Sequence, residues 1–556
     1  MQRTVVFLSW ENRLASVGGL GTTTRLLPQF LSDAGERVLL ITPFHRHHPA
    51  VRTAQRNGEF RCCFHGLRFE CGGGYLEVTC YQEKNVSVAT YHLDIRDRFR
   101  TGGNPYSYAD PTELLYDSLF FCAAVPDVLA RLGVRGSVVF HANDWETAPI
   151  APASRRAARA GILRSPRSVM TLHNCFDFPV SSRLRKRFLE GCPARQTILQ
   201  CCIPRIDGAL TTVSKPFAVE LRHDPLLKAV FAGHLQECFA EKAPVGIESG
   251  AFVRPDELAG EPAAAKQKAR YRYLLERKRA CEAQLREVMD EMDGPGSIGT
   301  LEYRKGRRRG CPLLFMAGRM DLSQKGFDVV FHAVKRIGKG KIKLLFCPSD
   351  LAAGTGQERN LEFFASIAHE MKGDIAIRPV RMPSTMFRTV MRGASYLLMP
   401  SLYEPFGAAS EGLLHGTPVV GRATGGLLSQ VHPVDGKSLK LPSYYRGLVN
   451  SFRHAGPSGI LFRENVSGRP ARDEWRDLLK APLHERPRYG VYRAMVDAAA
   501  RALEKSIEIY RSPERYAELM HNGASLLSGL GWGTTVRMYR RVYDDVCSRD
   551  GSAGRR

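Results

Sequence analysis

Short apolar runs alternate with helix-forming stretches in both halves of the sequence, and this alternation limits the fold more than any other feature. The strand-like runs of the first half are residues 4–9, 37–42, 137–141, 168–173 and 208–214. Those of the second half are residues 313–317, 343–347, 375–380, 396–400 and 419–422. Strands that alternate with helices form parallel βαβ units. The sequence therefore predicts an α/β fold in which two Rossmann-like, doubly wound parallel sheets face a deep cleft.

The length of 556 residues is too great for one hydrophobic core, so we expect two domains. The first Rossmann-like domain is predicted over residues 1–255 and the second over residues 311–530. Residues 256–310 between them are predicted to be a basic insertion or hinge, with one or two exposed helices in the Lys-, Arg- and Glu-rich segment 263–293. Residues 531–556 are expected to form a helix that crosses back to the first domain, followed by a basic tail.

The chain carries a net charge of +24, and its densest basic run is RKGRRR at residues 304–309. Nucleic acid, an anionic membrane or an anionic substrate could each account for such a charge. Nucleic-acid-binding motifs do not accompany the run and aromatic residues do not interleave it. We therefore interpret the run as part of a solvated linker and expect no nucleic-acid partner.

The N-terminal residues, MQRTVVFLSWENRL, lack the features of a signal peptide. The sequence also lacks a stretch that approaches the ~20 apolar residues needed to cross a bilayer. We expect a cytoplasmic protein without a membrane span. The fourteen cysteines are scattered, which favours buried free thiols over a disulfide framework or a zinc site.

Glycines follow the first predicted strand in the segment SVGGLGTTTRLLP, residues 16–28, which opens the first predicted helix. Glycines at such a position let backbone N–H groups approach a phosphate or sugar oxygen, and the helix N-terminus favours an anion. Any tight turn from strand to helix also uses glycine. The segment by itself is therefore compatible with a binding loop and with a purely structural turn.

Two further motifs end successive strands of the first half, HANDWETA at residues 141–148 and TLHNCFDF at residues 171–178. Both place imidazole, amide and carboxylate groups at the carboxyl edge of a parallel sheet, where ligands bind in this class of fold. A single histidine at a strand end is usually structural. Histidines at two successive strand ends indicate a site.

In the second half, Arg319 ends a predicted strand and Lys325 follows it by six residues, at the start of a helix. Two cations at this position can neutralise the phosphates of a departing nucleoside diphosphate without a metal ion. Either residue alone would be explained as well by a surface position. Farther along, Glu404 and Glu411 flank a short apolar run ahead of the Gly-rich turn at residues 424–426.

Eight motifs occur in the order and roughly the spacing seen in one enzyme family: SVGGLG, HANDWETA, TLHN, TTVS, GIESGAF, GRMDLSQKGFD, PSLYEPFG and TGGL. Through them the sequence resembles the bacterial glycogen synthases and plant starch synthases from about residue 3 to residue 545, least across residues 255–310 and 435–490. The resemblance implies a GT-B fold whose first domain holds an α-1,4-glucan acceptor and whose second domain holds a nucleotide-glucose donor. It also implies retaining transfer of glucose to the non-reducing 4-hydroxyl, without a metal or other cofactor. ADP-glucose is the preferred donor in this interpretation, with UDP-glucose as the alternative.

The resemblance also implies roles for individual residues. Arg319 and Lys325 would stabilise the leaving diphosphate, and Glu404 would face the transferred glucose. The remaining expected positions are His173 at the glucosyl C6 hydroxyl, Asp144 and Asn174 on the acceptor side, the peptide N–H groups of Gly18, Gly19, Thr424, Gly425 and Gly426 at phosphate and sugar oxygens, and Glu411 at the ribose. A carboxylate that favours the helix dipole is the alternative for Glu411.

The sequence departs from this family in two places. Ser16 stands where bacterial glycogen synthases have the lysine of K-x-G-G-L, which removes a cation expected near the donor. Glu404 and Glu411 are seven residues apart, whereas related transferases place these glutamates eight apart. Glu411 keeps the family's distance to Gly416, so we place the missing residue around residues 407–410, where it leaves Glu411 in register.

Three alternatives stay open on the sequence. A GT-B transferase with another acceptor, such as a phosphorylated sugar, a lipid or a capsular glycan, is one for which the positive charge would be a help. A non-catalytic protein that binds glucan or nucleotide is favoured by the loss of the first-loop lysine, whereas the retention of Arg319, Lys325, His173 and Glu404 argues for catalysis. A nucleic-acid binder depends on the basic charge alone.

Overall fold

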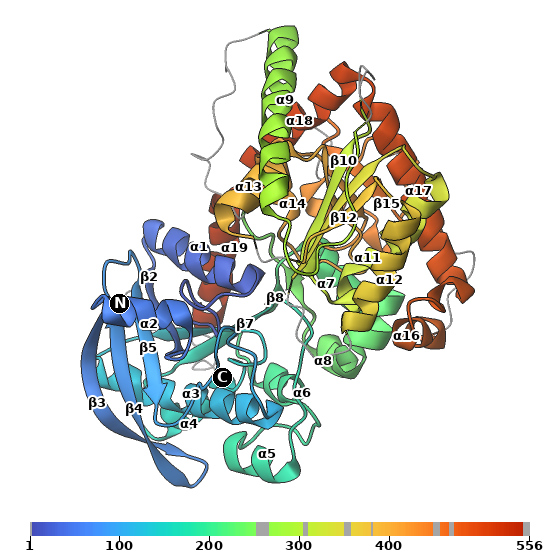
Figure 1. Cartoon of the computed structure of the whole chain (residues 1–556). Coiled ribbons are helices and arrows are strands. Elements are labelled where there is room, and N and C mark those ends of the chain that lie inside the picture. Colours follow the sequence, from blue (N-terminus) through green and yellow to red (C-terminus); the bar gives the residue numbers. More distant parts are fainter. Residues whose placement is uncertain are drawn as a thin grey trace. The chain divides into compact units, whose positions relative to one another are not determined.

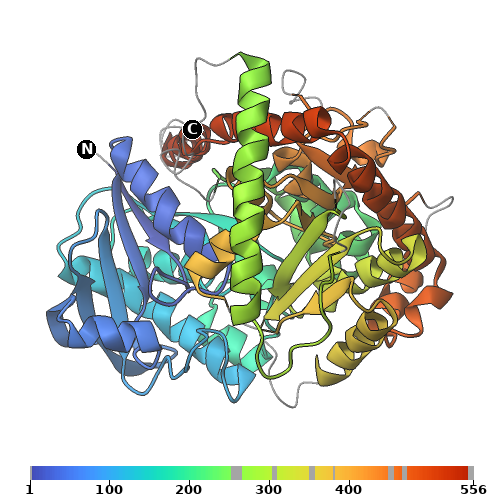
Figure 2. The ribbon, with the colours of Figure 1, turned by 45° about the horizontal axis from the view of Figure 1, so that its top comes forward.

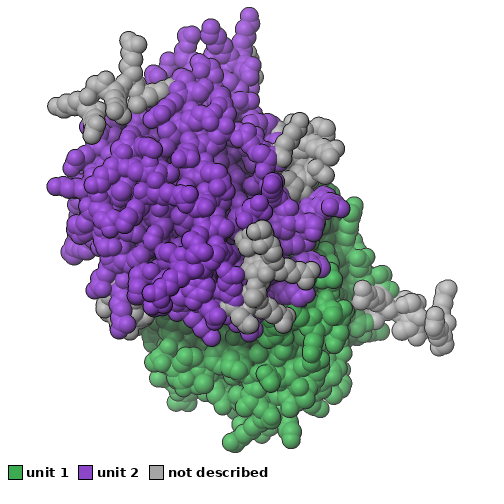
Figure 3. Space-filling view, turned by 90° about the vertical axis from the view of Figure 1, so that its right-hand side faces the viewer, with its two compact units in different colours: residues 1–222, 231–250, 532–556 green, residues 223–230, 251–531 purple. Residues whose placement is uncertain are grey.

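The computed structural model of the chain describes residues 3–251, 266–303, 310–349, 357–379, 382–436, 438–448, 456–465 and 472–548. The chain divides into two compact units (Figure 3). Unit 1 comprises Met1–Arg222, Phe231–Gly250 and Trp532–Arg556, and unit 2 comprises His223–Val230 and Ala251–Gly531. The expected first domain, residues 1–255, thus differs from unit 1 in three places: His223–Val230 and residues 251–255 belong to unit 2, and Trp532–Arg556 belongs to unit 1.

Unit 1 is built on a nine-stranded sheet in the order β3-β4-β5-β2-β1-β6-β7-β8-β9 (Figure 1). Its strands are β1 (Thr4–Leu8), β2 (Arg37–Pro43), β3 (Phe60–Cys71), β4 (Gly74–Glu83), β5 (Ala89–Ile95), β6 (Val138–Asn143), β7 (Arg167–Leu172), β8 (Leu210–Thr212) and β9 (Val245–Gly246). All neighbours from β5 to β9 run parallel, whereas β3 and β4 form an antiparallel hairpin beside β5. The helices are α1 (Gly19–Asp33), α2 (Pro49–Arg56), α3 (Pro111–Arg131), α4 (Ile150–Arg159), α5 (Ser182–Phe188), α6 (Ile198–Cys202), α7 (Lys215–His223), α8 (Gln236–Glu241) and α19 (Trp532–Ser548).

Unit 2 is built on a six-stranded parallel sheet in the order β12-β11-β10-β13-β14-β15. Its strands are β10 (Leu313–Arg319), β11 (Lys343–Ser349), β12 (Ile375–Ile377), β13 (Tyr396–Met399), β14 (Val419–Arg422) and β15 (Gly459–Phe462). The helices are α9 (Gln267–Glu291), α10 (Leu322–Lys325), α11 (Phe327–Ile337), α12 (Gln357–Glu370), α13 (Ser384–Gly393), α14 (Ala409–Leu414), α15 (Leu427–Gln430), α16 (Arg472–Lys480), α17 (Gly490–Tyr510) and α18 (Pro513–Gly529). Counted along the chain, this is the 3-2-1-4-5-6 strand order of the Rossmann fold.

The central strands are continuous apolar runs because helices cover both faces of each sheet. All five residues of β1 are buried, and so are the four residues of β13. In unit 1, α1 and α19 pack together over the sheet, where Phe7, Leu27 and Tyr543 belong to one core cluster. The C-terminal helix is therefore an integral part of the first sheet's covering layer.

The prediction of two doubly wound parallel sheets is confirmed. Each predicted strand run contains an observed strand, but the hairpin β3–β4 and the strands β5, β9 and β15 were not predicted. In both sheets the strand order reverses beside the first strand, between β1 and β6 and between β10 and β13. Ligands bind outside the carboxyl ends of the strands at such a reversal, so these two places are where candidate site residues must be sought.

The segment 263–293 contains one helix, α9, and the prediction that it is exposed is wrong for one face. This helix lies along α13 and α18 (Figure 2). Lys278 of α9 is buried and its ammonium group donates to the carbonyl oxygens of Arg392 and Gly416 and to the Thr417 hydroxyl. These acceptors stand at the ends of α13 and α14, where a cation is favourable. The basic run 304–309 lies outside the described residues.

The helices of the described residues include none with the length and hydropathy needed to span a bilayer. All fourteen cysteines are free, as expected, although six of them are partly exposed rather than buried.

Candidate active site

Arg319 and Lys325 are brought to the carboxyl end of β10 by a short, tightly held turn. Arg319 is the last residue of β10, and Lys325 is the last residue of α10. Asp321 caps α10 by accepting hydrogen bonds from the backbone N–H groups of Ser323 and Gln324 at 3.1 and 3.3 Å. The next residue, Gly326, has a left-handed backbone with φ of 57°, and a Cβ there would lie 2.6 Å from the Pro400 carbonyl oxygen. The turn therefore needs glycine to approach the end of β13.

Lys325 forms an ion pair with Glu404 across the strand reversal. The Lys325 ammonium group donates to Glu404 Oε2 at 2.8 Å, and the Ser401 hydroxyl donates to the same oxygen at 2.9 Å. Glu404 is buried, with 6% of its surface exposed. Arg319 donates to the Gln324 side-chain oxygen at 3.1 Å, and no carboxylate of the described residues lies within ion-pair distance of it. The pair of cations can thus receive an anion while Lys325 holds the carboxylate in place.

The loop predicted to hold sugar and phosphate oxygens begins the short helix α15. The carbonyl oxygens of Thr424 and Gly425 accept from the first N–H groups of this helix. The Gly426 N–H donates to the Glu404 carbonyl oxygen at 2.7 Å, so in this structure it is used within the chain, and its donation to a ligand stays a prediction. A Cβ on Gly426 would lie 2.6 Å from Phe406 Cα, which means that glycine permits the backbone contact between the loops after β13 and β14.

Glu411 lies in the first turn of α14, and burial raises the pKa of its carboxyl group. The helix begins at Ala409, after Gly407 with φ of 137°. Glu404 and Glu411 therefore do not share a helix. The seven-residue spacing crosses a loop and does not by itself rotate either side chain away from a common site.

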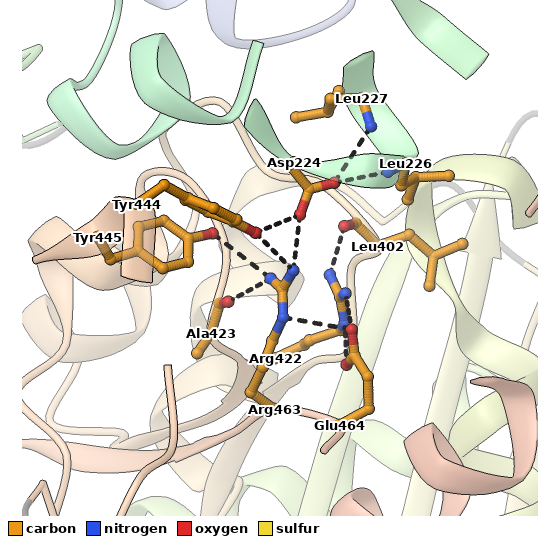
Figure 4. Close-up of polar contacts among 10 residues, drawn as sticks. All are labelled: Asp224, Leu226, Leu227, Leu402, Arg422, Ala423, Tyr444, Tyr445, Arg463 and Glu464. Atoms are coloured by element: carbon orange, nitrogen blue, oxygen red, sulfur yellow. Dashed lines mark hydrogen bonds and ion pairs between the residues drawn. The ribbon is translucent and has the colours of Figure 1, made fainter. Parts of the chain in front are cut away.

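A buried network of two arginines and two carboxylates supports both loops, and it was missed in the sequence (Figure 4). Arg422 ends β14; it pairs with Glu464 and also donates to the Leu402 carbonyl oxygen. Arg463 donates to the Asp224 carboxylate at 2.7 Å and to the Ala423 carbonyl oxygen at 2.8 Å. Leu402 is in the loop that carries Glu404, and Ala423 precedes the loop of Thr424.

Asp224 is fully used inside this network. Its carboxylate also accepts from the Tyr444 hydroxyl at 2.7 Å and from the backbone N–H groups of Leu226 and Leu227. Burial by itself would raise the pKa of Asp224, but Arg463 and Arg422 hold it below its usual value. The paired charges of this network thus join the segment His223–Val230 to the two loops of unit 2.

In unit 1 the glycine loop after β1 is closed by Glu11, which the sequence analysis also missed. Glu11 Oε2 accepts from the backbone N–H groups of Val17, Gly18 and Gly21 at 2.7, 3.2 and 3.1 Å. The Tyr106 hydroxyl donates to Glu11 Oε1 at 3.0 Å. In this structure the Gly18 N–H is thus used by a carboxylate of the chain, and the prediction that N–H groups around Gly18 and Gly19 hold a ligand stays a prediction.

The neighbours of Gly18 complete this loop. Gly19 is the first residue of α1. Ser16, at the position of the family lysine, packs against Gly21, where a Cβ would fall 2.0 Å from the serine hydroxyl. The loop therefore has a serine and the Glu11 carboxylate where the family has a cation. Glu11 follows the end of β1 in the sequence, and this position was a usable signal for it.

Asp144 organises the loop after β7. It has a left-handed backbone with φ of 58°, a conformation that costs a non-glycine residue free energy and is common at functional sites. Its Oδ1 accepts from the backbone N–H groups of His173 and Asn174 at 2.7 and 3.3 Å, and its Oδ2 accepts from the Asn174 amide at 3.1 Å. Asp144 and Asn174 are thus bonded to each other and shape the loop around His173.

The hydrogen bonds of Asn143 assign the tautomer of His173. The Asn143 amide nitrogen donates to the carbonyl oxygens of Leu8 and His141, so its Oδ1 is the acceptor for His173 Nε2 at 2.9 Å. Nε2 therefore carries the proton. Burial lowers the pKa of His173 to about 3, which keeps the ring neutral. The backbone N–H and the Nε2–H of His173 both donate hydrogen bonds within the chain. The lone pair of Nδ1 is therefore the acceptor that the ring offers to a ligand.

His141 is a core residue, so the interpretation that both strand-end histidines mark the site is wrong for it. It lies within β6, with Nδ1 at 2.8 Å from the Tyr543 hydroxyl and Nε2 at 2.7 Å from the Thr171 hydroxyl. Its ring is completely buried. The histidine therefore links the first sheet to α19.

Two buried acids, Asp144 and the nearby Glu146, have raised pKa values. Burial raises the pKa of Asp144 to about 7. Burial and the neighbouring Asp144 raise the pKa of Glu146 well above its usual value, and Glu146 Oε2 has no hydrogen-bond partner among the described residues. Raised carboxyl pKa values of this kind are typical of functional sites. Groups of three or more His, Cys, Asp or Glu side chains placed to hold a metal ion do not occur in the described part of the chain.

We expect the stability of Asp144→Asn relative to the wild-type protein to rise between about pH 4 and pH 7. Over this range the folded protein holds a proton on Asp144 that the unfolded chain has lost, so the free energy of unfolding of the wild-type protein falls as the pH rises. The variant lacks this pH-dependent loss. Because the Asn174 amide donates to Asp144 Oδ2, the variant also loses this hydrogen bond at every pH, and only the slope of stability with pH reports the titration. Thermal unfolding of both proteins between pH 4 and pH 8 measures the difference. Parallel curves would contradict the assignment, and exposed Asp290→Asn serves as the control.

Residues 4–235 match the family model described as starch synthase catalytic domain, and residues 278–443 match the model described as family 4 glycosyltransferase in conflict systems. Glycogen synthase 2 of Geobacter sulfurreducens is 25% identical over 500 residues, which cover 84% of this chain and 92% of the relative. Soluble starch synthase 1 of Oryza sativa subsp. indica is 25% identical over 464 residues, 77% of this chain and 67% of the relative.

Among solved structures, the catalytic domain of starch synthase IV from Arabidopsis thaliana, bound to ADP and acarbose, superposes with a TM-score of 0.69. The two sequences are 18% identical, and the superposition covers 98% of this chain and 99% of the other. This likeness shows that the two chains share a fold.

Proposed function

The chain belongs to the family of glycogen and starch synthases and is a glycosyltransferase, and from this premise we propose that it elongates an α-1,4-glucan with glucose from a nucleotide-glucose donor. We propose retention of the anomeric configuration, ADP-glucose as the preferred donor and a cytoplasmic location. The ADP in the starch synthase IV structure supports the choice of donor. The observation that carries the proposal is the Lys325–Glu404 pair beside Arg319, at the strand reversal of unit 2.

Arg319 and Lys325 are proposed to bind the diphosphate of the donor. Charge builds up on the leaving diphosphate as the glycosidic bond breaks, and fixed cations stabilise it most at that moment. Arg319 can give a bidentate contact to phosphate oxygens, whereas Lys325 acts as a point charge. Because these two cations supply the charge, we propose that the reaction uses no metal ion.

Glu404 is proposed to face the transferred glucose. Its carboxylate is held by Lys325 and Ser401, and from that position it can accept sugar hydroxyls and stabilise the positive charge that develops at the anomeric carbon. Glu411 is proposed to accept ribose hydroxyls. We assign no nucleophile.

In unit 1, His173 is proposed to accept a hydrogen bond from a glucosyl hydroxyl at Nδ1. Asp144 and Asn174 are proposed to act on the acceptor side through the loop that they shape, because their own polar atoms bond to each other and to the backbone. The expected contribution of these two residues is therefore to position His173.

A non-catalytic glucan- or nucleotide-binding protein is the second candidate. It is favoured by Ser16 and by the Glu11 carboxylate, which occupies the N–H groups of the glycine loop. A carboxylate at this place repels a phosphate. Such a protein would bind the donor at unit 2 and transfer nothing.

The experiment follows release of nucleoside diphosphate from ADP-glucose and UDP-glucose in parallel, with and without EDTA. Glycogen, maltoheptaose and glucose 6-phosphate are offered as separate acceptors. We expect release with glycogen and maltoheptaose, faster from ADP-glucose and unchanged by EDTA. Release with glucose 6-phosphate alone would assign another acceptor, and donor binding without release would establish the non-catalytic candidate.

A further inference from the structure

An arginine-lined hollow lies in unit 1 at the end of the sheet opposite the candidate active site. It has a volume of about 780 Å³, within the range of small-molecule pockets. Its wall is formed by the C-terminal part of α4, the start of β7 and the segments around Gly191 and Asp207. His173 follows the other end of β7, which is six residues or roughly 20 Å long. The hollow is therefore separate from the residues proposed to bind the sugar.

Five guanidinium groups line this hollow, those of Arg155, Arg159, Arg164, Arg167 and Arg205. The lining contains two carboxylates, Asp207 and Glu190, so the net charge of the hollow is +3. Lysine is absent from this lining. Arginine presents a planar fork of donors that matches the oxygens of phosphate groups.

The two carboxylates are already engaged. Asp207 pairs with Arg155 at 2.8 Å and also accepts from the backbone N–H and hydroxyl of Ser168. Glu190 makes a 3.4 Å contact with Arg159, and both side chains are about 60% exposed. Exposed pairs of this kind contribute little free energy and open readily. The acids therefore do not neutralise Arg164 and Arg205.

Arg205 is half-buried and Arg164 is exposed, and neither has a carboxylate within ion-pair distance among the described residues. Arg205 reaches across to Gly191, where a Cβ would lie 3.4 Å from its Nη2. Holding a guanidinium partly out of water without an acid is unfavourable unless an anion joins it.

The thiol of Cys192, next to Gly191, lies in the positive electrostatic field of the same arginines. Its pKa lies below the usual value because the Cys202 thiol donates to it and because Arg205 and Arg155 lie near it. A helix C-terminus favours cations and can explain Arg159 at the end of α4. It does not explain Arg164 and Arg205, which come from two other places in the chain.

We propose that this hollow is a binding site for a small ligand that carries phosphate groups, distinct from the donor site of unit 2. The guanidinium forks of Arg164 and Arg205 would hold the phosphate oxygens, and Arg155 and Arg159 would add donors from the α4 side. The proposal does not depend on the glucosyl transfer reaction.

The test is isothermal titration of the full chain with pyrophosphate and, separately, with glucose 6-phosphate. Both are titrated into a Lys325→Ala background, which weakens the proposed anion site of unit 2. We expect one binding site, with an affinity that falls at least about tenfold in Arg164→Gln/Arg205→Gln. The matched control is Arg96→Gln/Arg131→Gln, which removes two exposed charges of unit 1 outside the hollow. Its affinity should stay within about twofold of the background.

The two probes distinguish the chemical class of the ligand. Tighter binding of pyrophosphate would indicate a phosphoanhydride, and tighter binding of glucose 6-phosphate would indicate a phosphomonoester. Failure of both probes to bind, or an equal loss in the control variant, would overturn the proposal. Arg164→Gln alone changes an exposed side chain and is retained in case the double variant is misfolded. It is expected to weaken binding without lowering the melting temperature.

Discussion

Lys325→Ala is expected to lower the rate constant of glucosyl transfer by about 10²–10³, the effect of removing one preorganised group that stabilises charge in a transition state. The ammonium group lies 2.8 Å from Glu404 Oε2, so its loss removes a charge next to the leaving diphosphate and leaves the Glu404 carboxylate with Ser401 as its partner. The donor KM should change much less than kcat, because the interaction strengthens as charge develops. Initial rates over a range of donor concentrations measure both.

Lys335→Ala is the matched control for this prediction. Lys335 belongs to α11 and pairs with Glu370 on the surface, where both side chains are about half exposed. Its replacement should leave kcat within about twofold, since exposed pairs contribute little. A Lys325→Ala enzyme with wild-type kcat would contradict the proposed role of Lys325.

Asp224→Ala is expected to lower the free energy of unfolding by about 3–5 kcal/mol, because it removes one of the two carboxylates that pair with the buried Arg463 guanidinium and leaves that group with Glu464 alone. The same change frees the Tyr444 hydroxyl and the N–H groups of Leu226 and Leu227 from their acceptor. Since the pKa of Asp224 is lowered in the folded protein, its contribution is present above the pKa of the unfolded chain and is lost as the pH falls through the lower folded value. Urea unfolding at pH 7 measures the loss.

The exposed pair of Arg336 and Asp497 in unit 2 provides the comparison. Asp497→Ala removes a carboxylate of the same kind from the surface and should cost less than about 1 kcal/mol. Equal losses in the two variants would mean that the buried network adds nothing beyond a surface pair. Donor turnover should also fall in Asp224→Ala, since Arg463 holds the Ala423 carbonyl ahead of the loop of Thr424.

The parallel sheets were predictable because strands buried on both faces are nearly continuous apolar runs, as in the TVVFL of β1. The hairpin β3–β4 escaped prediction because half-exposed strands mix polar and apolar residues, as FRCCFHGLRFEC does in β3. The sequence of α9 indicated a helix, but the contacts that bury Lys278 come from α13 and α14 and leave no local pattern.

The place of the candidate site was predictable for the same reason as the sheets, since strand ends in a parallel sheet meet at one edge. Lys325 and Glu404 are 79 residues apart, yet both follow strands that are neighbours in unit 2. The partners of the glycine N–H groups were not predictable, because the same N–H can donate to a ligand or to the chain. Gly18 donates to Glu11 and Gly426 to the Glu404 carbonyl.

The pair of Asp224 and Arg463 shows most clearly which contacts the sequence does not predict. These residues are 239 positions apart, and the aspartate lies in a segment that leaves the sequence of unit 1 to join unit 2. Periodicity and motif spacing carry no information on such a contact. The network it completes nevertheless fixes the two loops that carry residues proposed to bind the donor.

Elongation of maltoheptaose tests the central claim most directly. The protein is incubated with ADP-glucose and the products are separated by length, with digestion by an α-1,4-specific exohydrolase. The account predicts a ladder that grows by single glucose units, disappears in Lys325→Ala and is fully digested. An unchanged maltoheptaose band with folded wild-type protein and both ADP-glucose and UDP-glucose would contradict it.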